Sequence, residues 1–168
     1  MGQDAPPNQA RRGNLLELTL KARDYSEVSS WIDSAGGDLD SFDFISTKFT
    51  LGDWISISEV FTPDFILVEG CVIWDRCFEQ QNFDLWWKTL SGDRTRIEAT
   101  LNQLRLWQLI GYRGSAEDLL AARSIADSIA QCWRTRLGER FPEIEFALSV
   151  AETEDGPIIR FNTVRTST

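Results

Sequence analysis

The sequence contains no histidine among its 168 residues. This absence excludes Ser-His-Asp triads, Cys-His pairs, HExxH zinc sites and imidazole proton shuttles. Carboxylate, lysine, tyrosine and oxygen-ligated metal chemistry remain feasible without imidazole. Neither GxGxxG nor GxxxxGK[ST] occurs, so a dinucleotide or P-loop site has no motif to support it. The sequence implies no cofactor, and we assign no catalytic residue.

Cysteine and long apolar runs are also scarce. Cys71, Cys77 and Cys132 form an odd set without CxxC spacing, which favours reduced thiols packed as small apolar side chains. No apolar run approaches the roughly 20 residues that a membrane span requires. We therefore expect a soluble cytoplasmic protein that contacts no membrane.

The residues that are present indicate a globular chain. Apolar residues make up 42% and charged residues 26%, and seven tryptophans and ten phenylalanines supply large core side chains. Residues 1–13 contain two prolines and few apolar side chains, which predicts a flexible tail. Residues 14–168 are expected to form one domain.

Alternation and β-branched residues predict strands in several places. Leu16, Leu18 and Leu20 alternate with polar residues over 14–23, which is typical of a half-buried strand. Residues 42–76 are rich in β-branched and aromatic side chains, which favours two or three strands. Near the C-terminus, 143–150 and 157–165 flank Asp155-Gly156 and predict a β-hairpin.

Helical periodicity covers most of the rest. We expect helices over 26–35, 83–90, 93–110 and 115–138, the last one capped by Ser115. Together these elements predict an α+β fold: an antiparallel sheet of about five strands, one face covered by three to four helices, closed by the C-terminal hairpin.

Two tryptophans stand side by side in FDLWWKTL. At about 100° per residue, Phe83, Trp86, Trp87 and Leu90 fall on one helical stripe, which favours packing onto the core over a binding platform. Leu85 points away from that stripe and is a candidate exposed contact.

The predicted 93–110 helix is apolar on two sides. One face carries Ile97, Leu101, Leu104 and Trp107, and the other includes Leu106 and Ile110. Such a helix is either enclosed within the monomer or lends its second face to another chain, for example in a homodimer.

The net charge of −9 is concentrated in one segment. Residues 33–84 contain eleven acidic and two basic residues, whereas the rest of the chain balances at fifteen of each. Acidic residues favour solubility, and when gathered on one face they also attract a basic partner. The candidate acidic contacts are Asp38, Asp40, Asp43, Asp53, Glu59 and Asp64.

Asp38, Asp40 and Asp43 are spaced closely enough to supply oxygen ligands to Mg²⁺ or Ca²⁺. The glycine and terminal glutamate of an EF-hand loop are missing, so a solvated loop is the simpler interpretation. Asp53, Asp64 and Asp75 are interpreted as turn or strand-end residues.

These patterns favour a non-catalytic protein-binding module, such as an inhibitor or immunity-like protein that covers a basic surface with the 33–84 segment. The alternatives are a carboxylate- and metal-dependent enzyme, and a structural subunit assembled through an apolar helix face. Nucleic-acid binding is disfavoured because neighbouring acidic residues offset the helical arginines.

Overall fold

The computed structural model describes residues 20–111 and 114–165. This part of the chain confirms the α+β class, but it contains two separate antiparallel sheets of two and three strands. The prediction of one sheet of about five strands is therefore wrong.

The elements are η1 (Ala22–Asp24), α2 (Ser26–Ser34), α3 (Ser41–Lys48), α4 (Leu51–Phe61), β1 (Phe65–Val68), β2 (Cys71–Trp74), η2 (Asp75–Cys77), α5 (Gln80–Thr89), α6 (Arg94–Leu101), β3 (Gln103–Arg105), η3 (Leu106–Gln108), α7 (Ala116–Arg140), β4 (Phe146–Thr153) and β5 (Gly156–Thr163).

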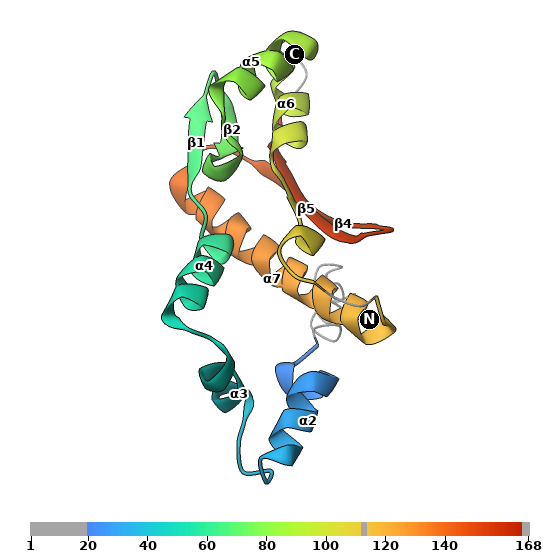
Figure 1. The fold of residues 1–168 in the computed structure, drawn as a ribbon. Coiled ribbons are helices and arrows are strands. Elements are labelled where there is room, and N and C mark those ends of the chain that lie inside the picture. Colours follow the sequence, from blue (N-terminus) through green and yellow to red (C-terminus); the bar gives the residue numbers. More distant parts are fainter. Residues whose placement is uncertain (1–19, 112–113, 166–168) are drawn as a thin grey trace, which may run out of the picture.

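The long helix α7 runs through the middle of the molecule, and the other elements are arranged around it (Figure 1). Strands β4 and β5 pack against α7. The β1–β2 hairpin, α5 and α6 lie at one end, whereas α2 and α3 lie at the opposite end, with α4 in between. We call residues 20–61, which contain η1, α2, α3 and α4, the helical arm.

Two hairpins lie where the sequence predicted strands, although only the C-terminal one was predicted as a hairpin. Strands β1 and β2 pair with Val68 opposite Cys71, and the connecting Glu69 and Gly70 both have positive φ, at 51° and 77°. This is the backbone twist that a two-residue hairpin loop requires. The predicted C-terminal hairpin is also confirmed: β4 and β5 pair over their full lengths, and β5 lies between β3 and β4.

The strands predicted between residues 42 and 61 are wrong, because this stretch forms helices α3 and α4. Each helix begins with a capping box: Asp40 with Asp43 for α3, and Thr50 with Asp53 for α4. These reciprocal bonds satisfy amide groups that the first turn leaves free. The caps therefore outweigh the strand propensity of the β-branched residues that follow.

The single helix predicted over 93–110 is also wrong, because α6 ends at Leu101 and the chain continues as β3 and η3. The change follows from Asn102, which is fully buried. Its side-chain amide accepts a hydrogen bond from the Trp74 amide at 2.9 Å and donates one to the Val72 carbonyl at 2.8 Å. These bonds dock the end of α6 on β2, and β3 then pairs with β5.

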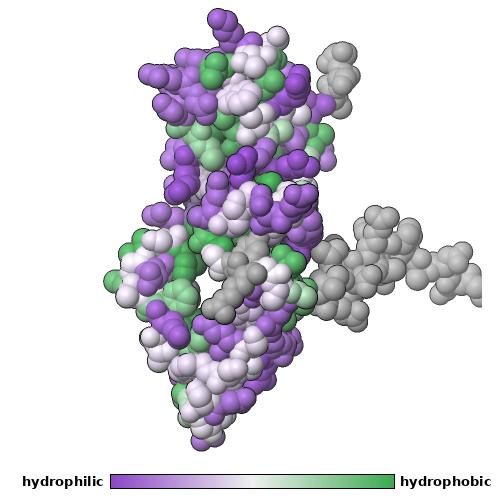
Figure 2. Space-filling view, turned by 45° about the vertical axis from the view of Figure 1, so that its right-hand side comes forward, coloured by the Kyte–Doolittle hydropathy of each residue, from purple (hydrophilic) through white to green (hydrophobic). Residues whose placement is uncertain are grey.

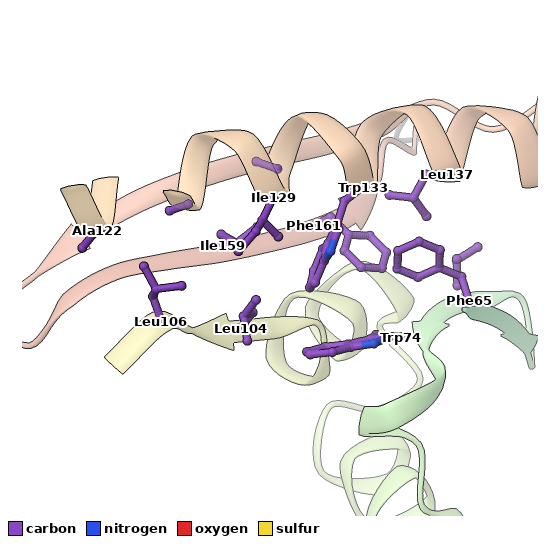
Figure 3. Packing of buried hydrophobic residues seen from close by; sticks show 13 residues of the cluster. Phe65, Trp74, Leu104, Leu106, Ala122, Ile129, Trp133, Leu137, Ile159 and Phe161 are labelled. Atoms are coloured by element: carbon purple, nitrogen blue, oxygen red, sulfur yellow. The ribbon is translucent and has the colours of Figure 1, made fainter. Parts of the chain in front are cut away.

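The main core surrounds Trp133 of α7 (Figure 3). Its indole lies 4.9 Å from the ring of Trp74, 5.9 Å from that of Phe65 and 6.1 Å from that of Phe161, measured between centroids. The rings come from both sheets as well as α7, so this cluster joins the two sheets. The indole N–H donates to the Val60 carbonyl at 2.8 Å, which ties the end of α4 to the core.

A second, smaller core confirms that the paired tryptophans pack inward. Trp86 and Trp87 are half-buried against a cluster that contains Cys71, Phe83 and Ile97. The Arg94 guanidinium lies 5.9 Å from the centre of the Trp87 ring, within the range of a cation–π contact. The tryptophan pair therefore fixes α5 on the β1–β2 hairpin.

Glu98 of α6 is fully buried and joins three parts of the chain. Its carboxylate accepts hydrogen bonds from the Val72 amide at 2.8 Å and from the Thr163 amide at 2.7 Å. The Arg165 guanidinium completes the site with two bonds of 2.8 Å. This bonding raises the pKa of Arg165. A buried charge with this many donors is compensated, whereas an unpaired one is costly.

Only part of the structure predicted for the N-terminal residues can be compared with the described chain, which begins at Leu20. The flexible tail over 1–13, and most of the strand predicted over 14–23, lie outside the described residues. Ala22–Asp24, at the end of that strand, form the 3-10 turn η1. The helices predicted over 26–35 and 115–138 are confirmed as α2 and α7, and Ser115 caps α7 by accepting from the Asp118 amide. No helix in the described part has the length and apolar character to cross a bilayer.

Candidate functional site

Helix α4 carries large apolar side chains on a face that no other described element covers. Leu51 is 78% exposed, Ile55 54% and Trp54 46%, and no residue of α4 is fully buried. These positions lie three and four apart, so they form one outward stripe. A soluble domain rarely leaves such a continuous apolar stripe in water without a reason, which makes it a candidate contact surface. We call Leu51, Trp54 and Ile55 the α4 outer face.

Apolar exposure continues into the turn that precedes α4. Phe42 of α3 is 78% exposed, and the Phe49 ring lies 6.0 Å from that of Trp54. The capping box of Thr50 and Asp53 fixes the end of this turn at the start of α4. In the space-filling view, green apolar surface borders an opening in the lower half of the molecule (Figure 2).

The opposite side of α4 faces a groove of about 1070 Å³. Its other walls come from α7, η3 and the segment around β2 and η2. The groove follows from the course of the helical arm, which is attached to α7 at its start and at its end. At the start, the Leu20 amide donates to the Ser124 hydroxyl at 3.0 Å and the Ser26 amide donates to Glu117 at 2.8 Å. At the end, the Trp133 indole N–H donates to the Val60 carbonyl. The apolar lining consists of Phe49, Ile57, Val60, Phe61, Pro63, Trp74, Leu106, Leu109, Ile110, Ile125 and Ile129.

Exposed acidic residues line the edge of the groove. These are Asp53, Glu59, Asp64 and Asp75, and among the described residues of the lining Arg76 is the one base. Asp64 pairs with Arg136 at 3.2 Å, an exposed contact that contributes little to stability. The groove therefore combines an apolar floor with a negative rim.

The three aspartates considered as possible oxygen ligands are not arranged around a common metal position. Asp38 is exposed in the turn before α3, whereas Asp40 and Asp43 bond to each other's backbone amides as the α3 cap. Among the residues that the structure describes, no group of three or more histidine, cysteine, aspartate or glutamate side chains is arranged to hold a metal ion. The helix cap explains the aspartate spacing.

The acidic segment 33–84 does not gather on one surface. It runs from the helical arm at one end of the molecule to α5 at the other, so that α3 and α5 lie far apart (Figure 1). Asp53, Glu59 and Asp64 share the groove region, but Asp38, Asp40 and Asp43 lie beyond it on the arm. The expectation of one continuous acidic face is therefore wrong for the whole segment. Only the acidic residues around α4 lie near one another.

The predicted apolar contacts also separate. Leu85 is 61% exposed on α5, away from the arm. Leu106 is fully buried in the main core, so it is not part of an exposed helix face, and Ile110 is half-buried in the groove wall. The exposed apolar helix is instead α4, which sequence reasoning missed because its alternating SISEV stretch was interpreted as a strand.

Two of the cysteines, Cys71 and Cys77, have thiols that burial keeps unreactive. Cys71 is fully buried, and desolvation raises its pKa to about 11. Burial also raises the pKa of Cys77. Since the thiolate is the reactive form, both side chains remain neutral thiols near pH 7.

The site is thus an apolar helix with an acidic groove behind it. This combination is suited to recognising another macromolecule by side-chain contacts and complementary charge. No protein-family model, curated protein or solved structure matches the chain.

Proposed function

We propose that this chain is a non-catalytic protein-binding module that uses the part of its acidic 33–84 segment around α4 against a partner with a basic surface. The observation that carries the proposal is the α4 outer face, three large apolar side chains exposed on consecutive turns. A partner that covers them removes apolar surface from water, which stabilises a complex by roughly 1 to 2 kcal/mol for each side chain.

The residue types support this role. Tryptophan is among the residues that most often dominate the binding energy of an interface, and Trp54 belongs to the α4 outer face. Trp54 and Ile55 lie three and four residues after Leu51, so all three side chains share one side of the helix. An inhibitor or immunity-like protein would use such a face to cover a partner's functional surface.

The charge favours a partner of different chemistry over a second copy of the chain. At a net charge of −9, two copies repel each other, whereas a basic partner is attracted and its encounter is accelerated. Glu59 lies one helical turn after Ile55, and Asp53 lines the groove behind α4, so this helix carries negative charge that attracts a basic partner.

The test is a pull-down from the native source with mass-spectrometric identification, comparing wild type with Leu51→Glu/Ile55→Glu. Both positions are exposed, so the double variant is expected to fold. Leu67→Glu/Leu85→Glu is the matched control, because these leucines are 60% and 61% exposed at the opposite end of the molecule.

We expect a specific partner that wild type and the control retain and that the α4 variant loses. A partner lost only by the control would place the site at the α5 end. A partner retained by both variants, or no specific partner at all, would contradict the proposal.

A further inference from the structure

The groove behind α4 has features that identify a more specific ligand than the α4 outer face does. Its floor is apolar, with Val60, Ile110 and Ile125 half-buried and packed against the main core. Its rim carries the exposed carboxylates of Asp53, Glu59 and Asp75, in addition to the paired Asp64. An occupant must therefore be apolar on one side and positively charged along its edges.

The walls decide the shape of the occupant. Helices α4 and α7 form two of the groove's walls, beside η3 and the segment around β2 and η2, and the backbone groups in the interior of both helices are already bonded within each helix. An added strand needs free backbone groups at a sheet edge, whereas a helix docks through side chains alone. The eleven residues of α4 span about 16 Å, which matches two to three turns of a docked helix.

We infer that the groove between α4 and α7 binds one amphipathic, basic helix of the partner protein. Its apolar side chains at positions i, i+3 or i+4, and i+7 lie on Val60, Ile110 and Ile125, and its lysines or arginines face Glu59 and Asp75. The inference rests on the proposed function and adds the partner's secondary structure and the location of its charges.

The test uses a fluorescein-labelled 14-residue peptide of leucine and lysine, with leucines at helical spacing, titrated with the full chain and followed by fluorescence anisotropy. A second peptide has glutamate in place of lysine. The rim variant is Glu59→Lys/Asp75→Lys, and the control is Glu139→Lys/Glu143→Lys, two exposed acidic residues outside the groove. Both variants change the net charge equally, so non-specific attraction to an acidic protein affects them alike.

We expect the lysine peptide to bind wild type and the control equally and the rim variant about tenfold more weakly. The glutamate peptide is expected not to bind. Ile110→Glu places a charge on the groove floor and is expected to abolish binding. Circular dichroism checks that each variant retains the wild-type fold.

Equal binding of the lysine peptide to the rim variant and the control, or no binding, would overturn the inference. Tighter binding in full-length Leu16→Glu/Leu18→Glu would also overturn it, because the chain's own 14–20 segment would then be the occupant. A dimer that dissociates when the peptide binds would identify a second copy as the occupant, with the same consequence.

The pull-down separates this inference from the proposed function. If the partner is lost by Leu51→Glu/Ile55→Glu but retained by the rim variant and by Ile110→Glu, the chain binds proteins through the α4 outer face and the helix inference is wrong. If none of these variants affects capture, both proposals fail.

Discussion

Glu98 is the residue on which the joining of the two sheets depends most directly. It receives donors from β2, from the end of β5 and from Arg165, although it has no exposed surface. A carboxylate in this position is not a sign of a catalytic site, because every oxygen is used by the fold. The Glu98 carboxylate accepts hydrogen bonds from backbone amides of β2 and β5, which in a continuous sheet would bond to a neighbouring strand.

Replacing Glu98 with glutamine removes the negative charge from this network and converts one acceptor into a donor. We expect Glu98→Gln to lower the free energy of unfolding by about 2 to 4 kcal/mol, because Arg165 and at least one backbone amide lose their partner. Urea denaturation followed by tryptophan fluorescence measures the change. Glu69→Gln is the control, as Glu69 is exposed, and a change of less than about 0.5 kcal/mol is expected. Equal stability of the two variants would contradict this account.

Tyr25 provides a second test at a single residue. Its hydroxyl donates to the Asp118 carboxylate at 2.8 Å, and this hydrogen bond, followed by partial burial and nearby carboxylates, raises the pKa of Tyr25. A raised pKa means that the bond stabilises the arm at all pH values below about 10 and is lost as the pH rises through the folded-state pKa.

We therefore expect Tyr25→Phe to increase hydrogen exchange in α2 at neutral pH, while exchange in β5 stays as in wild type. Ser26 still bonds to Glu117 in the variant, so the arm loosens without detaching. Hydrogen exchange with mass spectrometry gives the comparison. The prediction is wrong if α2 exchanges at the wild-type rate.

At the scale of elements, helix caps explain where sequence reasoning succeeded and failed. The start of α7 was predicted correctly because Ser115, a favourable N-cap residue, is followed by an apolar stripe at helical spacing. The cap of α4 was equally present in Thr50 and Asp53, but the ISISEV stretch that follows Trp54 alternates as a strand does. The helical spacing of Leu51, Trp54 and Ile55 was therefore overlooked in favour of that alternation. The candidate site was missed because its helix was interpreted as a strand.

The cap of α4 makes its first turn sensitive to acid. The Asp53 carboxylate accepts from the Thr50 amide at 2.7 Å and from the Thr50 hydroxyl at 2.8 Å, and these bonds lower the pKa of Asp53. A lowered pKa means that the cap is complete above about pH 4 and is lost as the pH falls through the folded-state pKa.

We expect the Thr50 amide resonance to shift below about pH 4, together with a loss of helical signal at the start of α4, in an NMR titration. Asp53→Asn removes the titrating group and is expected to abolish the shift while weakening the cap at neutral pH. A Thr50 resonance that titrates identically in the variant would show that another group is responsible.

At the scale of the whole molecule, the sequence predicted the α+β class and the C-terminal hairpin, but neither the β1–β2 hairpin nor the division into two sheets. That division depends on Glu98 and Asn102, whose side chains bond to the backbone of β2 across more than 25 positions in sequence. A polar residue within a helix carries no local sign of such a role. Hydrogen bonds between a side chain and a distant backbone group form only in the assembled fold, so local sequence patterns do not reveal them.

Burial distinguishes a densely packed core around α7 from a sparsely packed helical arm. In α2, α3 and α4 only Val28 is fully buried, whereas α7 and β5 contribute much of the main core. Local opening costs little free energy where few apolar contacts are lost, so the arm is expected to open far more often than the core. Native-state hydrogen exchange should show α3 and α4 exchanging at least about a hundredfold faster than α7.

The same measurement in the presence of the partner connects this motion to binding. If the α4 outer face and the groove form the interface, protection is expected to rise in α4 and in the facing part of α7, and to stay unchanged in α5. Leu67→Glu/Leu85→Glu should give the wild-type pattern, since it alters the other end of the molecule. Uniform exchange across the arm and the core in the free protein would contradict the expected opening of the arm. Protection confined to α5 when the partner is bound would show that the partner does not bind at α4.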